Sequence, residues 1–239
     1  FSMGSDVADI NHDGYMDLLS LDMLPEDEEV LKASDGDESV DILQLRINEL
    51  GYHYQFTRNM LQINQQGNHF LETALYSGVA ATDWSWSALF ADYNQDGEQD
   101  LFVFNGIPKR PNNLDYVKYI SNEQIQKKIS QTKLVDNEAL DLMPPGIVPN
   151  YIFEGKPGIG FQDRSGEWIS KDPMISNGSA YADFDNDGDL DVVANNLNST
   201  PALYENKTNE KAAYLKVKLE FEKANRFAIG AKVIAYHQG

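Results

Sequence analysis

One acidic pattern occurs three times in the sequence, and its spacing suits a divalent cation. In each copy, oxygen-bearing side chains stand at positions 1, 3, 5 and 9, and a glycine stands at position 6. Calcium takes about six to eight oxygen ligands in a flexible geometry, whereas magnesium requires a near-ideal octahedron, so the pattern predicts calcium, with about three ions in all. The side chains are Asp9, Asn11, Asp13 and Asp17 in the first loop, Asp92, Asn94, Asp96 and Asp100 in the second, and Asp183, Asp185, Asp187 and Asp191 in the third.

The pattern differs from that of an EF-hand. An EF-hand loop ends in a bidentate glutamate at its twelfth position and lies between two helices. The twelfth position here holds Ser20, Val103 and Ala194, none of which offers a carboxylate. Short apolar or aromatic runs flank each loop, and runs of this length between turns are typical of buried strands. The sequence therefore predicts a strand, a cation loop and a second strand in each copy.

The repeat extends beyond the loops and indicates the architecture. Residues 58–107 align with residues 149–198 without a gap, and the first loop with its flanks aligns with the second in the same way. Each unit contains a further strand, near residues 60–63, 151–154 and 202–206. Several short strands per repeated unit predict the four-stranded blades of a β-propeller. We therefore expect a mainly β fold, a partial propeller of about three blades with helical inserts between them.

Two inserts separate the repeated units, near residues 25–57 and near residues 108–149. The first ends in an amphipathic stretch, residues 40–50, whose apolar spacing predicts a helix. The second contains helical runs from Leu114 onward and stops before Pro144, because proline cannot continue a helix. Two interpretations of the inserts stay open: decoration that covers sheet edges, or a cap that binds a partner.

The charge and composition exclude several classes of function. The chain has 19 basic and 38 acidic residues and a net charge of −19, so nucleic acid and anionic membranes are poor partners. It has no cysteine, which excludes disulfides and thiolate chemistry. No apolar run reaches the roughly 20 residues of a membrane-spanning helix. Because the chain begins at Phe1 without a signal peptide, we expect a piece of a longer protein with any export signal upstream.

The last part of the sequence has a different pattern. Residues 214–221 alternate charged and apolar side chains as a half-exposed strand does, and residues 232–236 predict a second strand. We therefore expect propeller blades over residues 1–209 and the start of another small β domain, cut short, over residues 210–239.

These motifs resemble a known family. The loop between two strands resembles the FG-GAP/VCBS repeat, the calcium-bearing blade of integrin-type β-propellers, over the three repeated units. Residues 225–233 resemble the beginning of the ASPIC/UnbV domain, which follows such propellers in cartilage-acidic-protein-like chains. Residues 58–62 together with residues 82–86 are similar to the versions found in surface proteins of Bacteroidetes-type bacteria.

The resemblance carries expectations about fold, location and ligands. It implies a propeller, often of about seven blades, in a protein that is extracellular, at the cell surface or periplasmic. It implies structural calcium, with the backbone carbonyls of Tyr15, Glu98 and Asp189 added to the four side chains of their loops. Because asparagine replaces aspartate at position 3 of the first two loops, the third loop is expected to bind calcium most tightly.

Other residues were weighed for binding or catalysis. Trp84 and Trp86, beside Asp83, are candidates for a ligand surface because aromatic faces near carboxylates bind sugars and cations, and core packing is the alternative. The four histidines are scattered, and no zinc-protease, serine-hydrolase or phosphate-loop motif occurs. The sequence favours a non-catalytic, calcium-stabilised propeller that binds a protein or glycan. The alternative is a calcium-dependent polysaccharide lyase or hydrolase built on the propeller.

Overall fold

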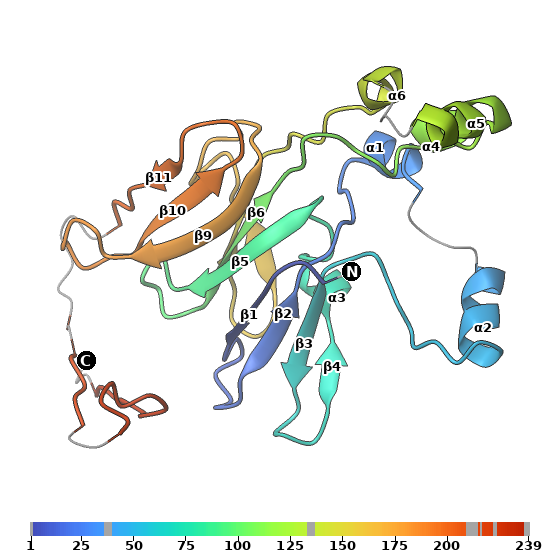
Figure 1. Cartoon of the computed structure of the whole chain (residues 1–239). Helices are drawn as coiled ribbons and strands as arrows, with labels where there is room; N and C mark the ends of the chain where they lie inside the picture. The colour runs from blue at the N-terminus through green and yellow to red at the C-terminus, as the bar shows by residue number, and fades with distance from the viewer. Residues whose placement is uncertain are drawn as a thin grey trace.

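The computed structural model describes residues 2–35, 40–132, 137–208, 215, 217–221 and 224–236. Within these residues the protein is mainly β, with eleven strands and six helices (Figure 1). The strands expected on both sides of each acidic loop are confirmed, as are the further strands expected in each unit. The chain thus forms hairpins wherever apolar runs flank a loop.

The strands form three antiparallel sheets in which spatial neighbours follow chain order. Each sheet is therefore a meander, and its first two strands enclose an acidic loop (Figure 1). The first sheet contains β1 (Ser5–Ala8), β2 (Asp17–Ser20), β3 (Met60–Asn64) and β4 (Phe70–Glu72). The second contains β5 (Ser85–Ala91), β6 (Asp100–Asn105), β7 (Tyr151–Gly155) and β8 (Phe161–Asp163). The third contains β9 (Ser176–Ala182), β10 (Asp191–Asn196) and β11 (Ala202–Tyr204).

The second sheet contributes side chains to a hydrophobic core on each of its faces. Every residue of β6 is buried, and its side chains alternate between two cores because successive side chains of a strand point to opposite faces. Leu101 and Val103 pack in the core shared with the first sheet, and Phe102 and Phe104 pack in the core shared with the third. The rings of Phe102 and Phe104 stack with centroids 4.3 Å apart. A one-residue slip would exchange the two cores, so this alternation fixes the register of β6.

A buried asparagine at equivalent positions joins each sheet to the next. Asn59 accepts a 2.9 Å hydrogen bond from the backbone just after β2 and donates one of 2.6 Å to Thr82, ahead of β5. Asn150 accepts a 2.9 Å bond from the last residue of β6 and donates one of 3.0 Å to Ser176, the first residue of β9. Because a buried amide without partners costs free energy, these bonds hold neighbouring sheets in a fixed relation.

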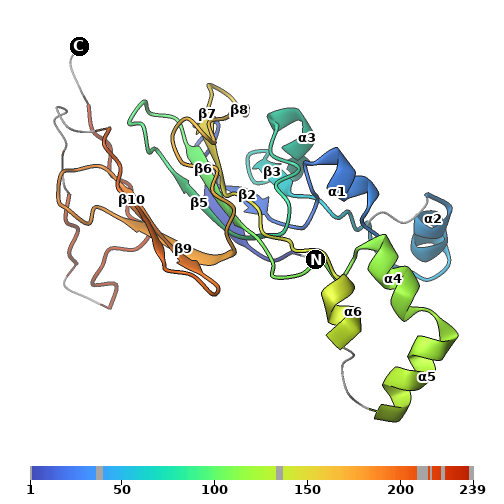
Figure 2. The same ribbon diagram turned by 90° about the horizontal axis from the view of Figure 1, so that it is seen from above.

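The helices expected in the inserts are also confirmed. The first insert contains α1 (Glu28–Lys32) and α2 (Val40–Asn48), and the second contains α4 (Leu114–Ile120), α5 (Glu123–Thr132) and α6 (Asn137–Leu142). The short α3 (Ala74–Ser77) follows β4. Since the sheets are antiparallel, inserts that follow β2 and β6 leave from the end opposite the acidic loops, where α1, α4, α5 and α6 gather (Figures 1 and 2). None of the described helices is both long and apolar enough to span a bilayer.

The two inserts are bonded to each other although they belong to different repeats. The N–H of Asp35 donates to the carbonyl of Asn112 at 2.6 Å, and the N–H of Leu114 donates to the carbonyl of Ala33 at 2.8 Å. Asn113, between these residues, caps α4 by accepting from two backbone N–H groups of its first turn. The two inserts are therefore linked by backbone bonds between the end of α1 and the start of α4, whereas α2 lies apart from α4, α5 and α6 (Figure 1).

The described residues after Thr208 form neither a helix nor a strand. The strands expected over residues 214–221 and 232–236 are therefore not formed in their described part, and residues 214 and 216 lie outside it. Instead, the side chain of Asn225 bonds the N–H and the carbonyl of Ile229, both at 2.9 Å, in a local turn. An alternating pattern produces a strand only where another strand pairs with its backbone, and none of the described strands pairs with this segment.

Candidate metal centre

The three acidic loops share one backbone conformation. Each joins the first strand of its sheet to the second. Residue 4 of the loop has a left-handed backbone, with φ of 57° at His12, 58° at Gln95 and 64° at Asn186. The glycine at position 6 has φ between 87° and 99° in all three loops, a conformation that side chains disfavour. Equal turns at equal positions give the three loops the same course between their strands.

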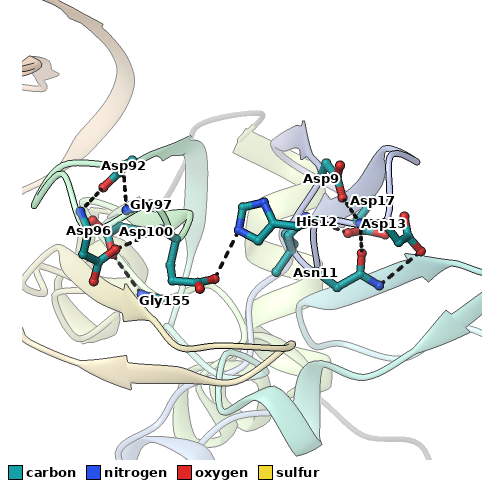
Figure 3. A network of polar contacts seen from close by, with 12 residues as sticks. Asp9, Asn11, His12, Asp13, Asp17, Asp92, Asp96, Gly97, Asp100 and Gly155 are labelled. Atoms are coloured by element: carbon teal, nitrogen blue, oxygen red, sulfur yellow. Dashed lines mark hydrogen bonds and ion pairs between the residues drawn. The ribbon is translucent and has the colours of Figure 1, made fainter. Parts of the chain in front are cut away.

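The aspartate at position 1 holds the turn of the first two loops. The two carboxylate oxygens of Asp9 accept the N–H groups of Asp13 at 3.0 Å and Gly14 at 2.9 Å (Figure 3). Asp92 accepts the N–H groups at the same two positions of the second loop, both at 3.0 Å. These bonds to backbone donors set the curvature of the loop. At Asp92, desolvation by burial outweighs the bonds from Gly97 and Asp96 and raises the pKa of the carboxyl group.

Position 3 distinguishes the first two loops from the third. The amide of Asn11 donates to the carboxylate of Asp13 at 3.3 Å, and the amide of Asn94 donates to that of Asp96 at 2.9 Å. The amide N–H thus offsets part of the negative charge at position 5. Asp185, at position 3 of the third loop, has no such donor when it is ionised.

Three carboxylates converge in the third loop. Asp183, Asp185 and Asp187 each offer an oxygen, and these oxygens lie within 4.8 Å of one another. The N–H of Asp187 lowers the pKa of Asp185, but desolvation and the negative charges of Asp187 and Asp191 outweigh it and raise that pKa. A divalent cation would replace this repulsion by attraction, and a donor set made only of oxygens suits a hard cation such as calcium. The residues present therefore fit the ion that the motif implies.

The aspartate at position 9 has a structural role that the sequence analysis missed. Asp17, Asp100 and Asp191 are buried, with 0%, 0% and 2% exposure. One oxygen of each accepts the N–H of position 2 in its loop, at 2.9, 2.9 and 3.0 Å. The other oxygen accepts an N–H from the last residue of the third strand of the same sheet or, in the third sheet, from two residues beyond it, at 2.8, 2.9 and 2.8 Å. These second donors are Asn64, Gly155 and Asn206.

Position 9 therefore ties the loop to its own sheet. Burial raises the pKa of Asp100 to about 6, although hydrogen bonds from the backbone of Gly155, Tyr93 and Asn94 lower it. Burial likewise raises the pKa of Asp17 against the bonds from Asn64 and Ile10. The expected role of this position as a calcium ligand stays a prediction, since both oxygens already accept backbone N–H groups.

The residues at position 7 lie directly beside the aspartates. The N–H groups of Tyr15, Glu98 and Asp189 donate to the position 5 aspartate of their own loops at 2.9, 2.9 and 3.2 Å. Each of these bonds closes a short turn over position 6. The residues whose carbonyls are expected as ligands are thus held against the other members of the predicted donor set.

Neighbouring loops also contact one another. His12 points from the first loop to the second, where its Nε2 lies 3.2 Å from Oε2 of Glu98 (Figure 3). Gln95 of the second loop donates from Nε2 to the carbonyl of Gly188 in the third loop at 3.2 Å. The three loops therefore form a continuous row across the three sheets.

The two tryptophans are half-buried at a junction between sheets. Nε1 of Trp86 donates to the carbonyl of Gly106 at 2.8 Å, which favours the packing interpretation for this residue. Trp84 follows Asp83, whose carboxylate forms a buried ion pair with Arg110 at 2.7 Å. A ligand surface at Trp84 and Trp86 stays a prediction.

The acidic loops recur at the same place in three sheets, and Asn225 closes a turn with Ile229 in the segment that follows the sheets. No family model matches the chain, and no curated protein is significantly similar to it.

Proposed function

We propose that the chain is part of a calcium-stabilised β-propeller that acts as a non-catalytic binding module for a protein or a glycan. The observation that carries this proposal is the recurrence of an oxygen-rich loop at the same place in three antiparallel sheets. Two of the sheets have four strands, and consecutive sheets share a hydrophobic core, as the blades of a propeller do. Calcium held at the hairpin of each blade would then stabilise the scaffold.

The outer faces of the first and third sheets support the propeller part of the proposal. Phe90 and Leu101 are register partners on the second sheet and are buried against the first. The equivalent partners on the first sheet, Val7 and Leu18, are exposed. Leu203 on the outer face of the third sheet is 66% exposed. Further blades on both sides would cover these residues as the second sheet covers its neighbours.

The ligand sets of the loops support a location outside the cytoplasm. None of the loops has a bidentate glutamate at position 12, and two have a neutral asparagine at position 3. Fewer ligand charges lower the affinity, and calcium sites of extracellular modules bind with Kd of about 10⁻⁴ to 10⁻³ M. Such sites fill only where calcium is abundant, so we place the protein in the periplasm, at the cell surface or in the medium.

The segment that follows α2 in the first insert offers a surface for a ligand. Tyr52, Tyr54 and Phe56 follow α2 and are all exposed, and the rings of Tyr54 and Phe56 stack with centroids 6.3 Å apart. Exposed aromatic side chains bind sugar faces and protein surfaces because they bury a large area at little entropic cost. We therefore propose a protein or glycan ligand here. From the sequence of residues 225–233 we propose separately that an ASPIC/UnbV-like domain starts in residues 210–239.

Calcium-dependent thermal unfolding tests the core of the proposal. An ion that binds only the folded state stabilises it by about 2.7 kcal/mol per site at a concentration one hundred times Kd. The Tm of the chain should therefore rise by several degrees, about 2–4 °C per kcal/mol, between chelator and saturating calcium, and magnesium should produce a smaller rise. Equal Tm values in calcium and in chelator would refute the structural role of the ion.

The binding role is tested separately. The full chain should be screened with calcium present against immobilised glycans and candidate proteins, and with Tyr54→Ala as the matched variant. Loss of binding in this variant supports the aromatic surface. Release of new reducing or unsaturated ends from any polysaccharide would instead show catalysis and overturn the non-catalytic part.

A further inference from the structure

The side chain at position 4 of one acidic loop reaches the next loop. His12 contacts Glu98 at 3.2 Å, and Gln95 donates to the carbonyl of Gly188 at 3.2 Å. We propose that these contacts couple the cation loops in series, so that calcium bound in one loop raises the calcium affinity of the next. This inference rests on the proposed function, because it requires that the loops bind calcium.

The proposed coupling begins at position 4 of a loop, at His12 in the first loop and Gln95 in the second. His12 lies between Asn11 and Asp13, two of the predicted ligands, and Gln95 lies between Asn94 and Asp96. Both residues have a left-handed backbone. A cation that holds the side chains on both sides of such a residue also restricts its φ and ψ, and therefore the direction of its side chain.

The second step is at the residue that receives the contact. The N–H of Glu98 donates to the carboxylate of Asp96 at 2.9 Å, so Glu98 is bonded directly to a predicted ligand of the second loop. Gly188 lies between Asp187 and Asp189, which belong to the predicted donor set of the third loop. Each contact therefore joins the immediate surroundings of one predicted cation to those of the next.

The third step is the direction of the contacts. Both run from position 4 of one loop to position 6 or 7 of the following loop. The second loop both receives a contact, at Glu98, and makes one, through Gln95. The two contacts consequently connect the loops of all three sheets, which share two hydrophobic cores. The second loop contacts both of the others, so calcium binding there should respond to the first loop and influence the third.

The sign of the coupling depends on two opposing effects. Ordering a loop costs conformational entropy, and a loop that its neighbour already holds loses less on binding its own cation. Two cations repel each other, but this repulsion is screened beyond about 3 Å in about 1 M salt. The side chain of His12 is 50% exposed and that of Glu98 is 22% exposed, so their contact is of modest strength. We therefore expect calcium bound in the first loop to raise the calcium affinity of the second loop about three-fold at high salt.

Site-resolved calcium titration of the full chain tests the coupling. The amide NMR signals of Gly14, Gly97 and Gly188, each at position 6, report the three loops separately. The test variant is His12→Asn, because asparagine tolerates a left-handed backbone and occurs at this position in the third loop, but is too short to reach Glu98. In about 1 M KCl, this variant should weaken calcium binding reported by Gly97 about three-fold.

A second variant separates coupling from a local defect. Asp13→Ala removes a predicted ligand of the first loop, so the first loop should no longer bind calcium. In a chain that keeps His12, this variant should weaken calcium binding at the second loop, reported by Gly97, about three-fold. In the His12→Asn background, Asp13→Ala should produce no further loss at Gly97. His69→Asn, in the exposed turn between β3 and β4, is the matched control and should leave all three titrations unchanged.

The outcomes distinguish this inference from the proposed function. If calcium shifts the three glycine signals but His12→Asn leaves the titration of Gly97 unchanged, the coupling is refuted and the calcium sites stand. If calcium shifts none of the three signals in the unmodified chain, both are refuted. A loss at Gly97 that is equal in the His69→Asn control would also refute the coupling.

Discussion

The third acidic loop has the same backbone conformation as the first two, but it differs from them in the hydrogen bonds that its carboxylates accept from side chains. In the first two loops, an asparagine amide donates to the carboxylate at position 5, at 3.3 and 2.9 Å. In the third, Asp185 stands in that place and three carboxylates converge within 4.8 Å. A single side chain thus separates a loop in which an amide donates to the position 5 carboxylate from one in which three carboxylates lie close together. If the loops bind calcium as proposed, their affinities should therefore differ.

The largest expected effect on the free energy of unfolding comes from the buried aspartate at position 9, which all three loops share. Asp100→Ala should lower the free energy of unfolding by about 3 kcal/mol, because it leaves buried backbone N–H groups without their acceptor. Asp191→Ala should lower it by a similar amount if position 9 acts alike in every loop. Urea denaturation in chelator measures both, with Glu28→Ala, in an exposed ion pair, as the control. A loss below about 1 kcal/mol for Asp100→Ala would contradict the tie between loop and sheet.

The next effect should separate the third loop from the others. Asp187→Ala removes one of the three converging carboxylates, so it should abolish the part of the calcium-dependent stabilisation that this loop supplies, about 2.7 kcal/mol at one hundred times Kd. Asp96→Ala, at the same position of the second loop, should remove less at the same calcium concentration because that site binds more weakly. Thermal unfolding with and without calcium gives both values. Equal losses would remove the distinction between the loops.

An exchange of side chains at position 3 should sharpen the comparison further. Asp185→Asn supplies the missing amide donor, so it should stabilise the calcium-free protein by about 1 kcal/mol and weaken calcium binding at the third loop. Asn94→Asp should do the reverse at the second loop. Calorimetric titration and unfolding in chelator measure these changes. If both variants shift stability in the same direction, charge at position 3 does not explain the difference.

The smallest effect on the free energy of unfolding is expected away from the loops, where Arg58 and Glu72 form an ion pair. Burial would raise the pKa of Glu72, but the hydrogen bond from Arg58 and those from the backbone of Ala74 and Leu61 lower it below its ordinary value. A lowered pKa stabilises the fold above the unfolded pKa, and this contribution disappears as the pH falls through the folded pKa. Glu72→Gln should therefore cost less than about 1 kcal/mol at pH 7 and nothing in strong acid. A cost that grows on acidification would contradict this sign.

The parts of the fold that sequence reasoning predicted are those encoded locally. The strands flanking each loop follow from short apolar runs between turns, and α2 follows from its apolar spacing. The loops themselves follow from four oxygen-bearing side chains and a glycine within nine consecutive residues. The expected strand over residues 232–236 is wrong, since alternation alone does not provide a partner strand.

The parts that it missed depend on residues far apart in the chain. Asp17 accepts from Asn64, 47 residues away, and Asp100 accepts from Gly155, 55 residues away. The sequence does not distinguish an aspartate that accepts backbone N–H groups from one that ligates a cation. The structural role of position 9 could therefore not be predicted from the motif. The contact of His12 with Glu98 spans 86 residues and has no local signal.

The bonds between the two helical inserts have a consequence for protein engineering. Each insert supplies backbone partners to the other through Asp35, Asn112, Ala33 and Leu114. A deletion confined to one of them would strand hydrogen-bonding groups on the other, in a different repeat. The two inserts are therefore linked to each other as well as to their own sheets, so a designer who moves one of them to another scaffold should move both.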